Sequence, residues 1–311
     1  MLEALSLQGF KSFGEEVRLD LAPLTVIFGP NAAGKSNFVD ALMLLSRLAT
    51  SQTLADAVSA PVRGYPLELF ALPQKGVAGL LEQERPTFTF EADLRPQGNG
   101  FTVRYRCEIG ILPRSGVLSV QNEYLAKLTR DGEPRGNPVI EKADGMLRVR
   151  RKSKPAHPWE EPVGLHYTLL SNLRYSGKEY EVLEITRNTL ASFRSYYLDP
   201  RVAMREGRPP REVDDIGPLG ADLGPFLYRL KAEHPRHFDT AIRTLRQIIP
   251  GVEDVRVELD EKRGLIDVEV VQEGRPFSIR VVSEGTLRVL ALVCIALNPW
   301  GGSLIAFEEP E

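Results

Sequence analysis

Gly29-Pro30-Asn31-Ala32-Ala33-Gly34-Lys35-Ser36 follows the apolar run Leu24-Thr25-Val26-Ile27-Phe28 near the start of this 311-residue chain. The spacing is that of a phosphate-binding loop, G-x-x-x-x-G-K-[ST], placed between a strand-like and a helix-like segment. Its glycines let the backbone curl around an anion, and the helix N-terminus points N–H groups at it. Lys35 would then reach the β- and γ-phosphates, and Ser36 would offer its hydroxyl to Mg²⁺. The alternative is an ordinary strand-to-helix turn that contains glycine.

The composition is that of a soluble globular protein. Hydrophobic residues make up 42% of the chain, charged residues make up 26%, and the formal net charge is −3. Because there is no overall basic excess, any contact with nucleic acid has to come from a local patch. Cys107 lies in a strand-like alternation and Cys294 far from it in an apolar helix-like run, which favours buried, reduced thiols and a cytoplasmic location. The longest apolar run, 289–297, is too short to span a bilayer, so no membrane contact is expected.

The first part of the chain predicts a sheet that leads into the loop. Alternating residues at 4–8 and 17–21 predict two strands around a turn at 9–14, and a helix that begins in the phosphate-binding loop is expected to run to about Ala49. Alternation returns in three runs between 87 and 128 and predicts an antiparallel meander. We therefore assign residues 1–165 to a lobe that combines the phosphate-binding loop with this meander.

The rest of the chain predicts helices first and strands afterwards. Helices are expected at 223–232 and 237–249, so 166–250 is assigned to a helical insertion. Strands at 252–259, 265–271 and 277–282, a capped helix and a last strand make up 251–311 and return to the core sheet. The predicted fold class is α/β, with a mixed central sheet formed from both ends of the chain, an antiparallel β subdomain and the helical insertion.

Residues 129–165 look the least ordered, because they are rich in Gly, Pro and charge. They contain a basic run made up of Arg148, Arg150, Arg151, Lys152 and Lys154. A solvated loop is the interpretation we favour, since short charge runs are usually solvated faces. The alternative is contact with a phosphate backbone, in which case charge reversal at Arg150, Arg151 and Lys152 flattens the salt dependence of DNA binding.

Two segments near the end of the chain add candidate site residues. Ser283 precedes a strongly apolar helix as its cap, and the helix N-terminus with Gly285 also suits a second anion site. The final residues, Ser303-Leu304-Ile305-Ala306-Phe307-Glu308-Glu309-Pro310-Glu311, predict a short buried strand that ends in carboxylates. Glu308 would hold the Mg²⁺ shell and Glu309 would polarise the attacking water. Taken alone, a core helix and a solvated acidic turn explain the same residues.

Four motifs together resemble the heads of ABC-type ATPases. They are Gly9-Phe10-Lys11-Ser12-Phe13, the phosphate-binding loop with Asn31 and the following Asn37, Ser283-Glu284-Gly285-Thr286-Leu287-Arg288, and Phe307-Glu308-Glu309-Pro310-Glu311. Within this class the chain is most similar to the RecF, SMC and Rad50 side, and specifically to stand-alone prokaryotic ATPases of the AAA_21 and AAA_15 type. The resemblance covers most of the chain.

The resemblance implies a protein that binds ATP and Mg²⁺ between two copies of itself. Ser283 and Gly285 of one copy would reach the γ-phosphate on the loop of the other, with Lys35 and Glu309 as catalytic residues. Lys11 and Ser12 would approach adenine or ribose, although a plain β-turn is equally consistent. Gln74 and Gln121 are candidates for a switch-loop glutamine, and surface positions are the simpler expectation for both.

In the family that the chain resembles, further strands and loops follow the Glu-Glu-Pro-Glu motif. We therefore expect this chain to be part of a longer or split protein, with an exposed apolar edge at 303–307 and weak ATP hydrolysis by itself.

Two functional hypotheses follow. The first is an ATPase that dimerises around ATP and acts on DNA in repair, chromosome maintenance or defence against phage. The second is a binding module with little turnover, in which ATP closes a dimer that regulates a partner such as a nuclease. A GTPase or small-molecule kinase is disfavoured, because the chain has no Asn-Lys-x-Asp guanine motif and neither class explains the helix capped by Ser283. A transporter ATPase is disfavoured by the strand meander between the loop and the acidic strand.

Overall fold

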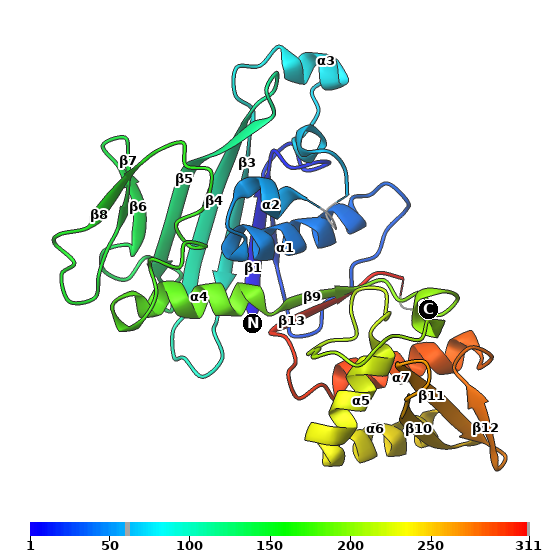
Figure 1. Cartoon of the computed structure of the whole chain (residues 1–311). Helices are drawn as coiled ribbons and strands as arrows, with labels where there is room; N and C mark the ends of the chain where they lie inside the picture. The colour runs from blue at the N-terminus through cyan, green and yellow to red at the C-terminus, as the bar shows by residue number, and fades with distance from the viewer. Residues whose placement is uncertain (60–62, 310–311) are drawn as a thin grey trace. The chain divides into compact units, whose positions relative to one another are not determined.

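The computed structural model describes residues 1–59 and 63–309. Packing divides the chain into two compact units, Met1–Phe193 and Arg194–Glu311 (Figure 1). Helix α4 (Glu181–Ala191), which the sequence places in a helical insertion, packs against helix α1 (Lys35–Thr50) of the first unit. The three-part division with boundaries at 165 and 250 stays a prediction.

An eight-stranded sheet forms the first unit, in the order β2-β1-β3-β4-β5-β6-β7-β8. Every neighbouring pair in it is antiparallel. The N-terminal hairpin and the antiparallel meander are therefore confirmed, while the mixed character expected for the sheet is not found in it. The strands are β1 (Leu2–Gln8), β2 (Val17–Asp20), β3 (Thr87–Leu94), β4 (Val103–Leu112), β5 (Val117–Lys127), β6 (Ile140–Ala143), β7 (Met146–Val149) and β8 (Trp159–Pro162).

Residues 129–165 are more ordered than the sequence suggests, because they supply β6, β7 and β8. Ile140, Leu147 and Val149 are buried and anchor the two central short strands to the core. Each of these strands has four residues, so the alternation runs over too few positions to stand out from the Gly, Pro and charged residues around it.

Helix α1 begins at Lys35 as expected and buries one apolar face that includes Leu44, Leu45 and Leu48. Figure 1 draws α1 and α4 side by side in this unit, which agrees with their packing. The shorter helices of the unit are α2 (Leu54–Val58), η1 (Pro66–Leu69), α3 (Gly76–Leu81) and η2 (Lys178–Tyr180).

A cluster of four aromatic rings fixes the turn at 9–14 to the sheet. Phe10 is fully buried and packs edge-on against Phe88 and Phe90, with ring centroids 5.6 and 5.0 Å apart, and Phe70 packs on Phe88 at 5.1 Å. The turn also binds η1 through its backbone, because Lys11 N–H donates to the Leu69 carbonyl over 2.9 Å. The neighbouring residues of the turn are thereby held in place.

The apolar run 24–28 is not a strand, contrary to expectation. Leu24, Val26 and Phe28 are 84%, 74% and 90% exposed, and no strand of the described chain pairs with them. High β-propensity makes a segment suitable for a sheet, but a strand also needs a neighbour whose N–H and C=O groups it can bind. The run therefore leads into the loop as extended, unpaired chain.

The second unit combines helices with a three-stranded antiparallel sheet, as the sequence predicts. Helices α5 (Leu223–Glu233), α6 (Pro235–Ile248) and α7 (Glu284–Ala296) surround a core shared with β10 (Val252–Asp260) and β11 (Leu265–Gln272). The third strand, β12 (Arg275–Ser278), ends earlier than expected. Past it, the Ile279, Arg280 and Val282 carbonyls accept hydrogen bonds from the Arg205 guanidinium, in the turn η3 (Ala203–Arg205).

The last strand, β13 (Leu304–Phe307), pairs with β9 (Phe193–Tyr196) in a two-stranded sheet. Phe307 stacks on Tyr196 with ring centroids 5.5 Å apart, and the Glu308 N–H donates to the Tyr196 carbonyl over 2.9 Å. Ile305 and Phe307 are each 39% exposed, so this strand is half-buried rather than buried as expected. The α/β fold class is confirmed, whereas no sheet of the described chain joins both ends of the sequence.

Candidate nucleotide-binding site

The loop at 29–36 takes the backbone shape of an anion cradle. Gly34 caps α1 with φ 92°, and Ala32 also has a positive φ of 66°. The first intrahelical bond runs from the Phe38 N–H to the Gly34 carbonyl over 3.0 Å, so the N–H groups of the first turn have no intrahelical acceptor. These groups and the helix dipole favour a negative charge in front of α1.

Lys35 closes the loop on itself. Its ammonium group donates to the Gly29 carbonyl over 2.8 Å and to the Pro30 carbonyl over 2.9 Å. The positive charge is thus held inside the loop, where an anion would be cradled. Loop, ammonium and helix N-terminus converge on one place, which is the arrangement that the sequence predicts for phosphate.

The turn at 9–14 packs directly on this loop. A Cβ atom added to Gly34 would lie 2.9 Å from the Ser12 Oγ and 3.5 Å from the Phe13 ring, so only glycine fits there. The Asn37 amide donates to the same Ser12 Oγ over 2.9 Å. Ser12 and Asn37, both predicted site residues, are therefore brought together at the start of α1.

An ion cluster lies beside the loop and includes two residues that the sequence reasoning missed. The Lys11 ammonium is 2.6 Å from the Asp40 carboxylate, and both side chains are only 11% exposed. Arg63 contacts the other Asp40 oxygen at 3.3 Å and donates to the Ser36 carbonyl over 3.2 Å. Asp40 follows Ser36 by one helical turn, so its position on the face of the loop was available from the sequence. Nothing in the sequence around Arg63 indicated that it lies beside the loop.

These groups border a pocket of about 580 Å³. The volume lies in the range of small-molecule and cofactor sites. Two lining residues, Lys11 and Arg63, are positively charged, and the carboxylate of the third charged one, Glu68, accepts from the Tyr65 N–H over 2.8 Å, so the pocket suits an anionic ligand of nucleotide size. Its lining residues are Lys11, Ser12, Gly14, Asn37, Arg63, Gly64, Glu68, Phe70, Ala71 and Leu72.

In the second unit, Ser283 caps α7 as predicted. Its Oγ accepts from the Thr286 N–H over 3.1 Å and lies 2.8 Å from the Thr286 hydroxyl. Gly285 has open space where a Cβ atom would be, so nothing within the unit crowds this helix start. The three Arg205 hydrogen bonds to residues 279–282 hold the chain that leads into it. The sequence reasoning missed this arginine, because the contact spans more than seventy positions.

The acidic residues follow β13. Glu308 is bound through its backbone to Tyr196, and Glu309 is exposed with a φ of 48°. Within the described chain no group of three His, Cys, Asp or Glu side chains is arranged to hold a metal ion. Pro310 and Glu311, which belong to the predicted motif, lie outside the described residues.

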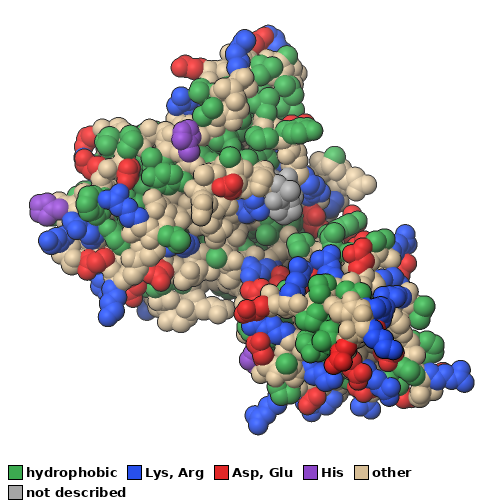
Figure 2. Space-filling view, viewed as in Figure 1, with side chains coloured by type: hydrophobic (Ala, Val, Ile, Leu, Met, Phe, Trp, Pro, Cys, Tyr) green, Lys and Arg blue, Asp and Glu red, His purple; other side chains and the backbone are tan. Residues whose placement is uncertain are grey.

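The basic run is mostly neutralised by neighbouring acids. Arg148 pairs with Asp144 and Glu160, each at 2.8 Å, Arg150 pairs with Glu141, and Lys152 lies 2.8 Å from Glu181. On the face drawn in Figure 2, Lys and Arg side chains are interspersed with Asp and Glu side chains. A phosphate backbone would therefore have to compete with internal partners at three of the five basic residues.

Other candidates have ordinary surroundings. Gln121 lies in β5, where it donates to Ser119 and accepts from Arg85, and Gln74 is exposed. Both cysteines are buried, and burial raises the pKa of the Cys294 thiol to about 12. In residues 1–59 and 63–309, no helix has the length and apolar character that crossing a membrane requires.

Local sequence similarity links the chain to chromosome partition proteins named Smc and to DNA replication and repair proteins named RecF. The chromosome partition protein Smc of Rhodopirellula baltica is 56% identical over 43 residues, which are 14% of this chain and 4% of Smc. The DNA replication and repair protein RecF of Thermosynechococcus vestitus is 26% identical over 176 residues, 51% of this chain and 46% of RecF. The chain thus matches less than half the length of each relative.

Two solved structures resemble the chain only loosely. The SMC head domain of Thermotoga maritima has a TM-score of 0.39 and 16% identity, over 99% of this chain and 77% of that one. The Smc head domain of Pyrococcus furiosus, bound to the C-terminal domain of ScpA, has a TM-score of 0.42 and 13% identity, over 95% and 78%.

The phosphate-binding loop and the RecF and Smc similarity define the class of this protein: it is a P-loop ATPase head of the RecF/SMC-like kind. More narrowly, residues 24–311 match the AAA_21 family, described as an AAA domain, putative AbiEii toxin, type IV toxin–antitoxin system. The chain belongs to this family. Membership carries ATP binding as a property of the family and confirms the resemblance drawn from the four motifs.

Proposed function

We propose that this protein binds Mg²⁺ and ATP at the loop 29–36, dimerises around the nucleotide and hydrolyses it. The observation that carries this proposal is the geometry at the start of α1, where the Lys35 ammonium lies inside the loop and the Ser12–Asn37 contact borders the pocket. Lys35 would exchange its two loop carbonyls for phosphate oxygens. Lys11 and Ser12 line the pocket, where the nucleoside would lie.

Ser36 and Glu308 are the residues that would hold Mg²⁺. A hydroxyl and a carboxylate are hard oxygen donors of the kind this ion prefers, and Ser36 stands in the first turn of α1. When bound, the ion would neutralise charge on the phosphates. Glu309 would accept a hydrogen bond from the attacking water and orient it.

The second half of the site would come from another copy of the chain. Support for this comes from Ser283 and Gly285, which begin a capped helix with open space around the glycine. A helix N-terminus presented to the γ-phosphate would stabilise negative charge in the transition state.

The biological setting we propose is DNA repair, chromosome maintenance or anti-phage defence. The names of the matching Smc and RecF proteins favour a role on DNA. The alternative is an ATP-gated module with little turnover that controls a partner such as a nuclease. The AAA_21 description, with its toxin–antitoxin system, favours this second setting.

Glu309→Gln separates hydrolysis from ATP-gated dimerisation. If Glu309 orients the water, the variant should accumulate ATP-bound dimers, measured by size-exclusion chromatography with light scattering and by retained nucleotide. Glu261→Gln, at an exposed turn position, is the matched control and should behave like the parent chain.

Two outcomes count against the proposal. An unchanged dimer lifetime in Glu309→Gln favours the binding module without turnover. ATP binding that survives Lys35→Ala removes the loop as the nucleotide site altogether.

A further inference from the structure

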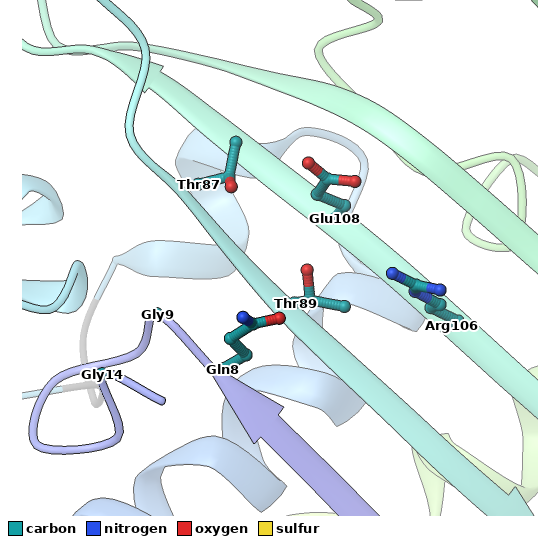
Figure 3. Close-up of a pocket in the computed structure, with 7 residues that line it drawn as sticks. All are labelled: Gln8, Gly9, Gly14, Thr87, Thr89, Arg106 and Glu108. Carbon is teal, nitrogen blue, oxygen red and sulfur yellow. The ribbon is translucent and has the colours of Figure 1, made fainter. Parts of the chain in front are cut away.

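A second hollow of about 250 Å³ lies in the first unit and shares the turn at 9–14 with the nucleotide pocket (Figure 3). Gly14 lines both hollows. The lining of the second one is almost entirely polar. It consists of Gln8, Gly9, Gly14, Thr87, Thr89, Arg106 and Glu108.

The register of three strands brings these side chains together. Thr89 of β3 lies opposite Gln8 of β1 on one side and Glu108 of β4 on the other. Arg106 precedes Glu108 by two residues and therefore stands on the same face of the sheet. The intervening residues, Phe90 and Cys107 among them, are buried on the opposite face, so the polar groups are not part of the core.

Two opposite charges in this hollow are left without protein partners. The Arg106 Nε is buried, and nothing in residues 1–59 and 63–309 accepts a hydrogen bond from it. No ion pair within 4.0 Å is formed by Arg106 or Glu108 in the same residues. Elsewhere on this face the charges are satisfied, since Arg18 and Arg104 both bind Asp93, at 2.9 and 2.7 Å. A buried donor without a partner is unfavourable, so the hollow favours an occupant that accepts a hydrogen bond from Arg106.

The lining residues also indicate which charged groups the ligand carries. A guanidinium fork matches a carboxylate, whereas the Glu108 carboxylate accepts only and repels a plain anion. The occupant therefore presents a carboxylate to Arg106 and a positively charged donor to Glu108, with Thr89 opposite Glu108 on the neighbouring strand. The hollow is smaller than the roughly 300–1,000 Å³ of drug-sized sites, so the ligand is small.

We propose that this hollow is a binding site for a small zwitterion of the α-amino-acid class. Its carboxylate lies on Arg106 and its ammonium group on Glu108.

A ligand in this hollow should also change the affinity of the nucleotide pocket. This second part of the proposal rests on the proposed function. Gly9 and Gly14 form one wall of the hollow, and the turn between them carries Lys11 to Asp40 and Ser12 to Asn37. A ligand that fixes this wall changes the position of both side chains. Linkage makes the effect reciprocal, so nucleotide and zwitterion change each other's affinity by the same factor.

The site itself is tested on the full chain without nucleotide. We would titrate the standard α-amino acids by calorimetry at millimolar concentration, with acetate and methylammonium as half-ligands. At least one amino acid should bind, and both half-ligands should bind at least about tenfold more weakly, because each loses one charged contact. Arg106→Gln and Glu108→Gln should each weaken the binding by a similar factor.

Matched controls remove a charge of the same sign from the same sheet face, outside the hollow. Arg18→Gln controls for Arg106→Gln, Asp20→Asn, whose side chain is 84% exposed, controls for Glu108→Gln, and neither should change the titration. The proposal is overturned if no amino acid binds, if acetate binds as tightly as the zwitterion, or if binding survives both substitutions in the hollow.

The coupling is tested separately, by measuring the ADP affinity with and without the zwitterion that binds. A change of severalfold in the parent chain that disappears in Arg106→Gln supports the coupling. An unchanged ADP affinity overturns the proposed coupling but does not contradict the zwitterion site. Loss of ADP binding in the parent chain contradicts the proposed function instead, while the nucleotide-free titration still decides the zwitterion site.

Discussion

Gly34 is the residue on which the phosphate-binding loop depends. Its φ of 92° is one that L side chains rarely adopt, and a Cβ would sit 2.9 Å from the Ser12 Oγ. We expect Gly34→Ala to lower the free energy of unfolding by about 1–3 kcal/mol and to weaken nucleotide binding, because both the backbone and the Ser12 contact must shift. Urea denaturation and a fluorescent ATP analogue measure the two effects.

Gly100→Ala is the control for this substitution, since Gly100 has open space and no positive φ. It should leave both measurements unchanged. An equally stable Gly34→Ala protein with full nucleotide affinity would contradict the packing of the turn on the loop.

Glu123 is a buried carboxyl with an unusual titration. It accepts hydrogen bonds from the Leu169 and Leu170 N–H groups over 2.6 and 2.9 Å and from the Tyr105 hydroxyl over 3.1 Å. Burial raises the pKa of Glu123 from 4.5 to about 7, and these hydrogen bonds limit the rise by favouring the ionised form. The folded protein therefore holds this proton at pH values where the unfolded chain has lost it.

The direction of the pH dependence follows. The contribution of Glu123 to the free energy of unfolding is complete below pH 4.5, falls as the pH rises towards about 7, and is then constant. Over that range we expect a loss of up to about 3 kcal/mol. Chemical denaturation at several pH values should show this slope in the parent chain and a shallower one in Glu123→Gln. Equal slopes would mean that Glu123 titrates normally.

At the scale of elements, the Lys11–Asp40–Arg63 cluster ties the turn at 9–14 to α1. Both members of the Lys11–Asp40 pair are largely buried, so removing one charge leaves the other without a partner in a poorly hydrated place. We expect Asp40→Asn to lower the free energy of unfolding by about 3–5 kcal/mol if Lys11 stays buried, and less if it swings into water. Nucleotide affinity should fall as well, because Lys11 and Arg63 lose their common anchor.

Glu82→Gln is the matched control, because the Lys75–Glu82 pair is 70% and 63% exposed. Exposed pairs contribute about 0–1 kcal/mol, so this variant should unfold like the parent chain. If Asp40→Asn behaves in the same way, the cluster is not a structural tie. Thermal and urea unfolding compare the two variants directly.

At the scale of the whole molecule, the nucleotide loop and the Ser283 helix belong to different compact units. If two copies complete each other's nucleotide sites, a Lys35→Ala chain still supplies an intact Ser283 helix. A Ser283→Arg chain still supplies an intact phosphate-binding loop. Mixing the two should restore one intact composite site per heterodimer. In the Glu309→Gln background, ATP-dependent dimers should therefore appear in the mixture and in neither variant alone.

Light scattering with and without ATP measures this complementation. A mixture that stays monomeric, while the Glu309→Gln parent dimerises, would show that Ser283 does not act on the loop of a second copy. A mixture of either variant with unaltered Glu309→Gln chain controls for the concentration of competent protein.

The sequence by itself determined the features that depend on near neighbours in the chain. The loop 29–36, the start of α1 at Lys35, the Ser283 cap and the strands of the meander all follow from glycine positions, capping side chains and alternation within a few residues. These are local preferences, which short stretches of sequence express directly.

Only the tertiary structure decided which segments pair and which charges meet. The apolar run 24–28 has the composition of a strand but no neighbour, whereas β6 to β8 form strands from weak local patterns because β5 offers an edge. Asp40 binds Lys11 and Arg63, and Arg205 binds carbonyls of 279–282, across long separations in the chain. Pairing and ion contacts are made between distant residues, and their free energy exists only once folding has brought both partners together.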